Sequence, residues 1–217
     1  MEFMQRAKPL PYWASPFISS LSQGVYRLPY WRRLLDILLA AGGLLLLALL
    51  LPWLWLANRC WAPGPLFYRQ MRVGLGGAIF EIIKLRSMIV DAERGGIAWT
   101  AVDDPRITVI GHFLRRTHLD ELPQCWNILK GDMTLIGPRP EQLAFVELLT
   151  SHIDGYALRH TIKPGITGWA QVNYGYGASV ADARIKLQYD LEYMAHQSWR
   201  LDLLILLRTF RVLWKGR

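Results

Sequence analysis

The chain has only two cysteines, Cys60 and Cys125, which lie far apart and without a Cys-x-x-Cys spacing. They provide neither a disulfide framework nor a structural zinc site, and their number fits a reducing, cytoplasm-facing compartment. None of the five histidines forms a metal-binding pair. The sequence also lacks internal repeats and, apart from one leucine-rich run, low-complexity tracts. These absences exclude a disulfide-stapled secreted domain and a zinc module.

Familiar phosphate-binding motifs are missing as well. The glycine cluster Gly74–Gly77 lacks the Gly-Lys-Ser/Thr ending of a P-loop and does not complete Gly-x-Gly-x-x-Gly. It instead predicts a turn that joins two extended segments, 67–73 and 78–88, into a hairpin. The stretch Asp103–Arg106 is not an Asp-x-Asp metal motif, and it predicts a turn before a helix over 107–116.

The composition indicates an anionic partner and contact with lipid. At 217 residues the chain can bury one sizeable core, and its net charge of +8 suits nucleic acid, acidic lipid or a phosphorylated substrate. Its 52% apolar content and 10 tryptophans favour a membrane-associated protein, because tryptophan is enriched at membrane interfaces. Nucleic acid is not expected as a partner, since the basic residues lie beside leucine stretches and no recognition motif is visible.

One segment predicts a membrane-embedded helix. From Ile37 to Asn58 there are 22 residues without a formal charge, and a helix of that length reaches about 33 Å, enough to span a hydrocarbon core. Pro52 inside the run, the Gly42-Gly43 pair and basic residues on both sides favour a re-entrant hairpin over a spanning helix. None of these features decides between a re-entrant hairpin and a spanning helix.

The C-terminal part predicts mostly helix. A helical pattern covers 180–196, while 162–173 is typical of a loop with a short strand. In the segment 199–217 the basic residues gather within an arc of about 80° on a helix, which leaves a broad apolar face; they are Arg200, Arg208, Arg211 and Lys215. Such a helix either lies in the lipid headgroup region or packs on the core with a solvated basic stripe.

The segment 114–140 carries the candidate chemistry. Thr117 and Asp120 match the Ser/Thr-x-x-Asp/Glu signature of a helix start, and Pro123 is tolerated only near a first turn. Asp120 and Glu121 are therefore expected near the positive end of a helix, where an ionised carboxylate is favoured. The pair could bind a hard cation such as Mg²⁺ together with substrate phosphates, or supply a carboxylate nucleophile. A solvated helix cap without chemistry is the simpler alternative.

Four motifs give the chain a family resemblance. They are Lys84-Leu85-Arg86-Ser87-Met88, Asp104-Pro105-Arg106, the whole of Leu114–Pro140, and Lys163–Asn173, which reads Lys-Pro-Gly-Ile-Thr-Gly-Trp-Ala-Gln-Val-Asn. Together they resemble the bacterial sugar transferase family, the monotopic polyprenyl-phosphate phosphoglycosyltransferases. The similarity runs from about residue 31 to the C-terminus. Leu85 stands where many relatives carry phenylalanine, which we interpret as a packing difference.

The resemblance implies a two-step reaction. The aspartate matching Asp120 attacks the sugar-linked phosphate of a UDP-sugar and releases UMP. A polyprenyl phosphate, usually undecaprenyl phosphate, then takes the phosphosugar from the enzyme. Glu121 matches the second member of the catalytic pair, and Mg²⁺ is the expected cofactor, with Glu121 and Asp120 as its expected ligands. The substrate-binding residues implied are Arg139 with its flanking Pro138 and Pro140, and less directly Arg86 and Arg115.

The predicted fold class is α/β, mostly α, in a monotopic membrane protein. It comprises an N-terminal interfacial segment (1–30), a re-entrant membrane helix hairpin (31–60), and a compact catalytic core with a short β-hairpin and amphipathic interfacial helices (61–217). The expected location is the inner membrane with the catalytic region facing the cytoplasm, as a minimal or excised core and compatible with a homodimer. The predicted pathway is glycoconjugate or exopolysaccharide synthesis, with UDP-glucose or UDP-galactose as suggested donors. The alternatives are a membrane-anchored metal-dependent phosphatase and a non-catalytic scaffold.

Overall fold

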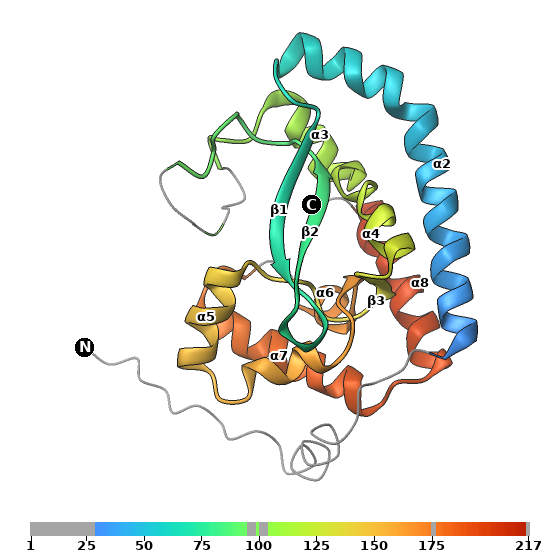
Figure 1. The fold of residues 1–217 in the computed structure, drawn as a ribbon, viewed down its shortest axis with the longest axis vertical. Coiled ribbons are helices and arrows are strands. Elements are labelled where there is room, and N and C mark those ends of the chain that lie inside the picture. The colour runs from blue at the N-terminus through green and yellow to red at the C-terminus, as the bar shows by residue number, and fades with distance from the viewer. Residues whose placement is uncertain (1–28, 95–98, 100–103, 175–176, 216–217) are drawn as a thin grey trace.

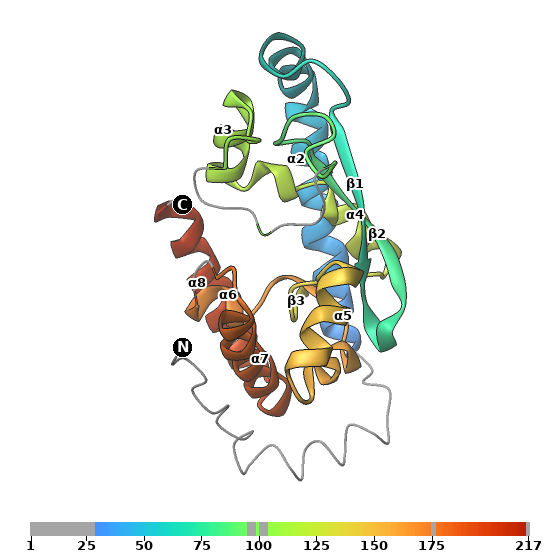
Figure 2. The same cartoon turned by 90° about the vertical axis from the view of Figure 1, so that its left-hand side faces the viewer.

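A computed structural model describes residues 29–94, 99, 104–174 and 177–215, so the predicted interfacial segment 1–30 falls almost wholly outside the described residues. The described chain is mostly helical with two small sheets (Figure 1). Its elements in chain order are α2 (Tyr30–Trp61), β1 (Phe67–Val73), η1 (Leu75–Gly77), β2 (Ile79–Leu85), α3 (Val109–Thr117), η2 (Leu119–Glu121), α4 (Gln124–Lys130), β3 (Thr134–Ile136), α5 (Leu143–His152), η3 (Tyr156–Thr161), β4 (Gly165–Thr167), α6 (Trp169–Asn173), α7 (Val180–Ala195) and α8 (Trp199–Lys215). Figure 2 shows α3 in the upper part of the molecule and α5 to α8 in the lower part, with α2 and the hairpin running along both.

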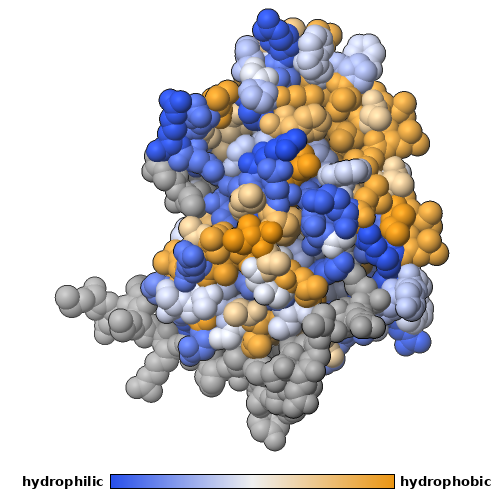
Figure 3. Space-filling view, in the orientation of Figure 1, coloured by the Kyte–Doolittle hydropathy of each residue, from blue (hydrophilic) through white to orange (hydrophobic). Residues whose placement is uncertain are grey.

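The apolar segment forms one continuous helix. It contains Pro52 and bends in its C-terminal part (Figure 1). By length and composition alone it could cross a membrane. The predicted re-entrant hairpin is therefore not confirmed, because the chain bends here without folding back into two antiparallel helices. Apolar side chains on α2 form much of the apolar edge in Figure 3.

A second face of α2 packs on the rest of the protein. Ala40, Leu47 and Leu54 are buried and recur at intervals of seven residues, which keeps them on one side of a helix. Ala40 joins a hydrophobic cluster with residues from β2 and α4, and the two leucines join another that includes Leu85 and Leu114. Helix α2 is thus part of the core.

Buried polar contacts fix the first turns of α2. Arg32 Nε lies 3.0 Å from Asp202 Oδ2 of α8, and Tyr193 Oη of α7 donates to the same carboxylate at 3.0 Å. One turn later, Asp36 accepts a hydrogen bond of 2.8 Å from Thr134 Oγ1 at the start of β3. These contacts join the first turns of α2 to α7, α8 and β3.

The predicted hairpin is confirmed. Strands β1 and β2 pair antiparallel, with Gln70 opposite Ile82, and Gly76 adopts a positive φ of 64° in the turn. Asn127 of α4 lies at the free edge of β2, where its Nδ2 donates to Glu81 O at 2.7 Å and its Oδ1 accepts from Ile83 N at 3.2 Å. Its side chain therefore satisfies backbone groups that a third strand would otherwise bind.

The second sheet and the C-terminal helices differ in part from the predictions. Strands β3 and β4 pair in parallel, and the segment predicted as a loop with a short strand also contains the helix α6. In α8, Ile205 and Asp202 are buried, whereas Leu207 and Phe210 are exposed. This helix therefore packs on the core and still presents apolar residues outward. Its position in a headgroup region stays a prediction.

Candidate active site

The adjacent carboxylates lie in a short turn between two helices. Helix α3 ends at Thr117, His118 takes a left-handed conformation (φ 57°), and Asp120 and Glu121 follow in η2. The predicted capping role of Thr117 is wrong, because its hydroxyl donates to Phe113 O at 2.8 Å and so closes the preceding helix. The pair does come shortly before a helix, since α4 begins at Gln124.

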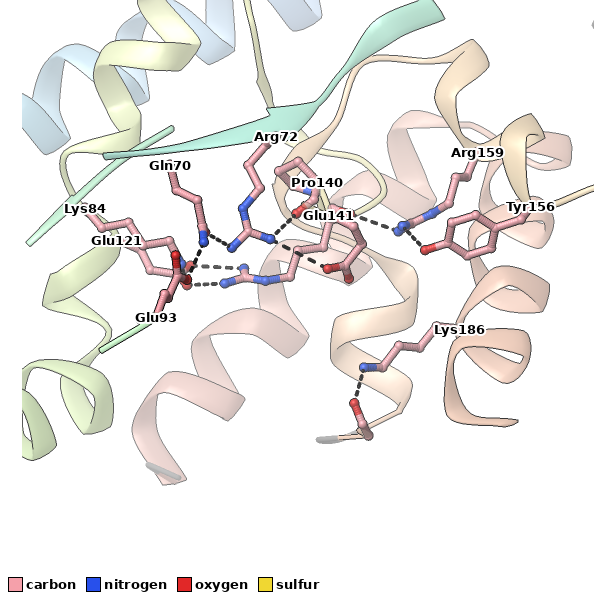
Figure 4. Close-up of polar contacts among 12 residues, drawn as sticks. Gln70, Arg72, Lys84, Glu93, Glu121, Pro140, Glu141, Tyr156, Arg159 and Lys186 are labelled. Atoms are coloured by element: carbon pink, nitrogen blue, oxygen red, sulfur yellow. Dashed lines mark hydrogen bonds and ion pairs between the residues drawn. The ribbon is translucent and has the colours of Figure 1, made fainter. Parts of the chain in front are cut away.

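Glu121 is held by two cations from distant parts of the chain. Lys84 Nζ of β2 lies 3.2 Å from Glu121 Oε1, and the Arg139 guanidinium binds both carboxylate oxygens. Figure 4 shows Lys84 and Glu121 side by side. Burial alone would raise the pKa of Glu121, but the two cations more than offset it and hold that pKa well below its usual range. Glu121 is therefore ionised, and both of its carboxylate oxygens already bind cations.

Asp120 has a different environment although it is the next residue along the chain. Its side chain is buried, with 8% of the residue exposed, and no ion pair within the described residues involves its carboxylate. Burial first, and the charge of Glu121 second, raise the pKa of Asp120 to about 6, although Lys84, Arg139 and Arg115 act in the opposite direction. The structure thus contains one neutralised carboxylate and one basic, poorly solvated carboxylate. Such a difference between the pKa values of two neighbouring carboxyl groups is typical of acid–base or nucleophilic sites.

The segment Pro138–Pro140 brings Arg139 to the pair. It follows β3, and Gly137 allows it to pass close to the chain before β4, since a Cβ on Gly137 would lie 2.4 Å from Lys163 O. Pro138 O accepts a hydrogen bond from Gly165 N at 2.9 Å, and Arg159 donates to Arg139 O at 2.9 Å. The backbone of this segment is therefore fixed on both sides of the arginine.

The other predicted arginines take different places. Arg115 on α3 is half-buried and close enough to Asp120 to lower its pKa. Arg86 lies outside this arrangement: its guanidinium donates to Asn58 Oδ1 at 3.1 Å and to the carbonyl of Ala62, at the end of α2. The structure therefore brings together Asp120, Glu121, Arg139 and Arg115, and it places Arg86 in a structural contact.

Two cations near the pair were not predicted. Lys84 lies in the same motif as Arg86, and the resemblance implied only the arginine as a substrate-binding residue. Arg72 on β1 donates a hydrogen bond of 3.2 Å from its guanidinium to Pro140 O. The signal that could have found both is the hairpin itself, because residues opposite each other and two apart along a strand share one face. Lys84 pairs with Tyr68, so Lys84 and Arg72 lie on the same face.

The metal-binding capacity of this site is limited to the two carboxylates. No group of three or more His, Cys, Asp and Glu side chains suited to a metal occurs among the described residues. Mg²⁺ commonly uses one or two carboxylates and completes its shell with water and substrate phosphates. Asp120 and Glu121 fit that pattern, provided that Glu121 shares its oxygens with the cations that now bind them.

A comparison with protein families decides the affiliation of the chain. The model of the bacterial sugar transferase family matches residues 27–216. The chain belongs to the bacterial sugar transferase family. The match covers α2, the hairpin, the carboxylate pair and the C-terminal helices, so all parts of the site described above lie within it.

Several curated family members are similar to the chain. A UDP-N-acetylgalactosamine-undecaprenyl-phosphate N-acetylgalactosaminephosphotransferase of Aeromonas hydrophila is 46% identical over 71% of this chain and 37% of its own length. A UDP-glucose:undecaprenyl-phosphate glucose-1-phosphate transferase of Escherichia coli is 41% identical over 89% of this chain and 42% of its own length. One of the same name from Caulobacter vibrioides is 42% identical over 82% of this chain and 67% of its own length. The chain thus spans less than half the length of the first two.

Proposed function

We propose that this chain transfers a sugar 1-phosphate from a UDP-sugar to undecaprenyl phosphate or a similar polyprenyl phosphate, and releases UMP. The single observation that carries the proposal is the buried Asp120 carboxylate, with a pKa of about 6, beside a Glu121 neutralised by two cations. At neutral pH such an aspartate is ionised, weakly solvated and basic for a carboxylate, which suits a nucleophile. The names of the curated relatives support the same substrate classes.

The reaction divides into two displacements at one phosphorus atom. In the first, an Asp120 oxygen forms a bond to the sugar-linked phosphorus, the bond to the bridging diphosphate oxygen breaks, and UMP leaves with that oxygen. In the second, a phosphate oxygen of the acceptor attacks the same phosphorus and the bond to Asp120 breaks. The products are a polyprenyl diphosphate sugar and the regenerated carboxylate.

The neighbouring residues neutralise and position the phosphates. Both oxygens of Glu121 are held by cations, so Glu121 orients Lys84 and Arg139 while Asp120 reacts. The two cations and the half-buried Arg115 offset charge on the transferred group, which is the main requirement of phosphoryl transfer. Burial lowers the pKa of Lys84, and Glu121 counteracts part of that effect.

Mg²⁺ is part of the proposal. Asp120 and Glu121 are its expected protein ligands, with the donor's phosphates as the others, and it would supply positive charge that polarises the phosphate oxygens. We expect EDTA to abolish UMP release and Mg²⁺ to restore it. Unchanged turnover in EDTA would remove Mg²⁺ from the proposal.

We also propose that the protein works at the cytoplasmic face of the inner membrane, with α2 inserted as a re-entrant element. The exposed apolar side chains of α2 support insertion, and its bend with Pro52 inside supports a helix that does not cross straight through. Tags at both ends should then be accessible from the cytoplasmic side only. A periplasmic N-terminus with a cytoplasmic C-terminus would instead require a spanning helix.

The decisive experiment is a mass measurement after incubation with a UDP-sugar and Mg²⁺ but no acceptor. We expect a phosphosugar adduct on the peptide that carries Asp120, and no adduct in Asp120→Asn. Asp154→Asn is the matched control, because Asp154 is exposed. Release of free sugar phosphate without any acceptor would favour the phosphatase alternative. A protein that binds lipid but releases no UMP with any donor would favour the scaffold, and the same screen of UDP-sugars would identify the sugar.

A further inference from the structure

The charged side chains continue past the carboxylate pair toward α7. Arg72 points from β1 toward Pro140 and Glu141, and Lys186 of α7 lies on the far side of Glu141 (Figure 4). Arg139 lies between this group and the pair, since it binds Glu121 while its charge also acts on Arg72 and Lys186. One arginine therefore connects the carboxylate pair, through Glu121, to a second cluster of charge.

Arg72 is not fully satisfied in this cluster. It donates to Pro140 O and to Gln70 Oε1, but its Nε is buried and has no hydrogen-bond partner within the described chain. Its ion pair with Glu141 is loose, with 3.6 Å between Nη1 and Oε2. A buried N–H without an acceptor costs free energy, so a ligand oxygen placed here would bind favourably.

Lys186 also makes fewer hydrogen bonds than it can donate, whereas Arg159 is paired with a carboxylate. Among the described residues the Lys186 ammonium donates one hydrogen bond, to Gly177 O at 3.2 Å, out of the three that it can donate. Arg159 binds Asp190 through two nitrogens, at 2.8 and 3.0 Å, and so has a carboxylate of its own. Within the part of the chain that the structure describes, Glu141 is thus the carboxylate whose charge acts on both Arg72 and Lys186.

We propose that Arg72 and Lys186 form a second anion subsite, which holds the nucleotide-side phosphate of the donor and then UMP, and that Glu141 takes the place of this phosphate when the subsite is empty. A carboxylate and a phosphate offer a guanidinium the same kind of acceptor oxygens, so one can replace the other. The proposal rests on the proposed function, because it assigns one half of the donor that this function requires.

The exchange has a consequence for turnover. The nucleotide phosphate must leave before the acceptor phosphate can approach the modified Asp120. Glu141 belongs to the same polypeptide and cannot diffuse away, so it always competes with UMP for Arg72. It therefore weakens product binding, and its removal tightens that binding.

The test is the affinity of the full chain for UMP, measured by calorimetry in detergent without donor or acceptor. Arg72→Gln should weaken UMP binding about tenfold or more, because a charge-assisted hydrogen bond is lost. Glu141→Gln should tighten it about threefold or more, because a competing and repelling charge is gone. Arg69→Gln is the control: Arg69 is on the same strand but exposed on the opposite face, and it should bind UMP as the wild type does.

A purely structural role for Arg72 predicts a different pattern. If Arg72 serves only to hold Pro140 O and Gln70 Oε1 together through its two terminal nitrogens, then Arg72→Lys should bind UMP as poorly as Arg72→Gln, because lysine cannot form the same forked contact. We expect Arg72→Lys to recover much of the affinity, since it keeps the charge. Equal loss in both variants, or weaker UMP binding in Glu141→Gln, would overturn the subsite.

A polyprenyl phosphate offers the same phosphate chemistry, so it is titrated in parallel. The subsite predicts that Arg72→Gln leaves its affinity unchanged, and a loss confined to this lipid would overturn the assignment to the nucleotide. The outcome differs from failure of the proposed function. That function fails if Asp120 acquires no phosphosugar, whereas the subsite fails if UMP binds the wild type and Arg72→Gln alike or binds neither.

Discussion

Replacing Asp120 with asparagine removes a charge that the folded protein holds in a poorly solvated position. The pKa of Asp120 is raised from 3.8 to about 6, and one pKa unit corresponds to about 1.4 kcal/mol. Above pH 6 the carboxylate is ionised in the folded and unfolded chains alike, so its ionisation opposes folding by about 3 kcal/mol. Asparagine has nearly the same shape and no charge. Asp120→Asn should therefore abolish UMP release and, at the same time, stabilise the fold.

The stabilisation has a defined pH dependence. As the pH falls from 6 toward 3.8, the folded carboxyl group takes up a proton before the unfolded one does, and the advantage of Asp120→Asn shrinks until it disappears near pH 4. For a chain of this size, about 3 kcal/mol corresponds to a rise in Tm of about 6–12 °C at pH 7.5.

The assay is thermal unfolding in detergent, followed by the fluorescence of the 10 tryptophans at pH 7.5 and pH 4.5. Asp154→Asn makes the same chemical change at an exposed position and should leave the Tm unchanged. If Asp120→Asn lowered the Tm at both pH values, the Asp120 carboxylate would be a stabilising group, and the reasoning about its burial would be wrong.

Three further changes test the site and the core. In the first half-reaction, the rate of UMP release should rise with pH through about 6, because only the ionised Asp120 can attack; a rate that is flat from pH 5 to 8 would contradict this. Gly137→Ala should lower both stability and turnover, by about 1–3 kcal/mol in unfolding experiments, because the new Cβ would lie 2.4 Å from Lys163 O and displace the segment that carries Arg139. Arg32→Ala should destabilise the fold by about 3–5 kcal/mol, because it leaves the buried Asp202 carboxylate, whose side chain is 6% exposed, without its cation. A chain of this size loses about 2–4 °C of Tm per kcal/mol. A Tm within about 2 °C of the wild type would therefore show that this ion pair contributes little.

The hairpin and the helix α7 could be predicted from local sequence patterns. The hairpin followed from a glycine cluster between two extended segments: β1 has the predicted bounds, and β2 begins one residue later and ends three residues earlier than predicted. The helix α7 followed from its period, over 180–196 as against Val180–Ala195. Both are decided by residues that are neighbours along the chain.

The partners of the candidate site could not be predicted in the same way. Asp120 and Glu121 were found from adjacency and resemblance, but Lys84 reaches Glu121 across 37 positions of sequence. From the same motif, the resemblance implied Arg86 and not Lys84 as a substrate-binding residue. Strand β2 ends at Leu85, so the alternation that directs Lys84 to the site does not extend to Arg86. Which of two neighbouring cations faces a site depends on where the strand stops.

The Thr117 prediction failed for a related reason. A hydroxyl three residues before a carboxylate can cap a following helix or bond back to the helix before it. Here His118 adopts a left-handed conformation and ends α3, which leaves Thr117 inside that helix. The sequence contains both options, and only the tertiary structure selects one.

Because Ala40, Leu47 and Leu54 of α2 complete two of the hydrophobic clusters, this helix cannot be treated as a detachable anchor. A truncated chain that began after Trp61 would expose Ile82, Leu85 and Leu114 to water and would lose the carboxylate of Asp36 that binds Thr134. Efforts to obtain a water-soluble form by deletion should therefore yield aggregates. Polar substitutions at the outward positions Leu38, Leu45 and Leu49 leave those clusters intact and are the better route to solubility.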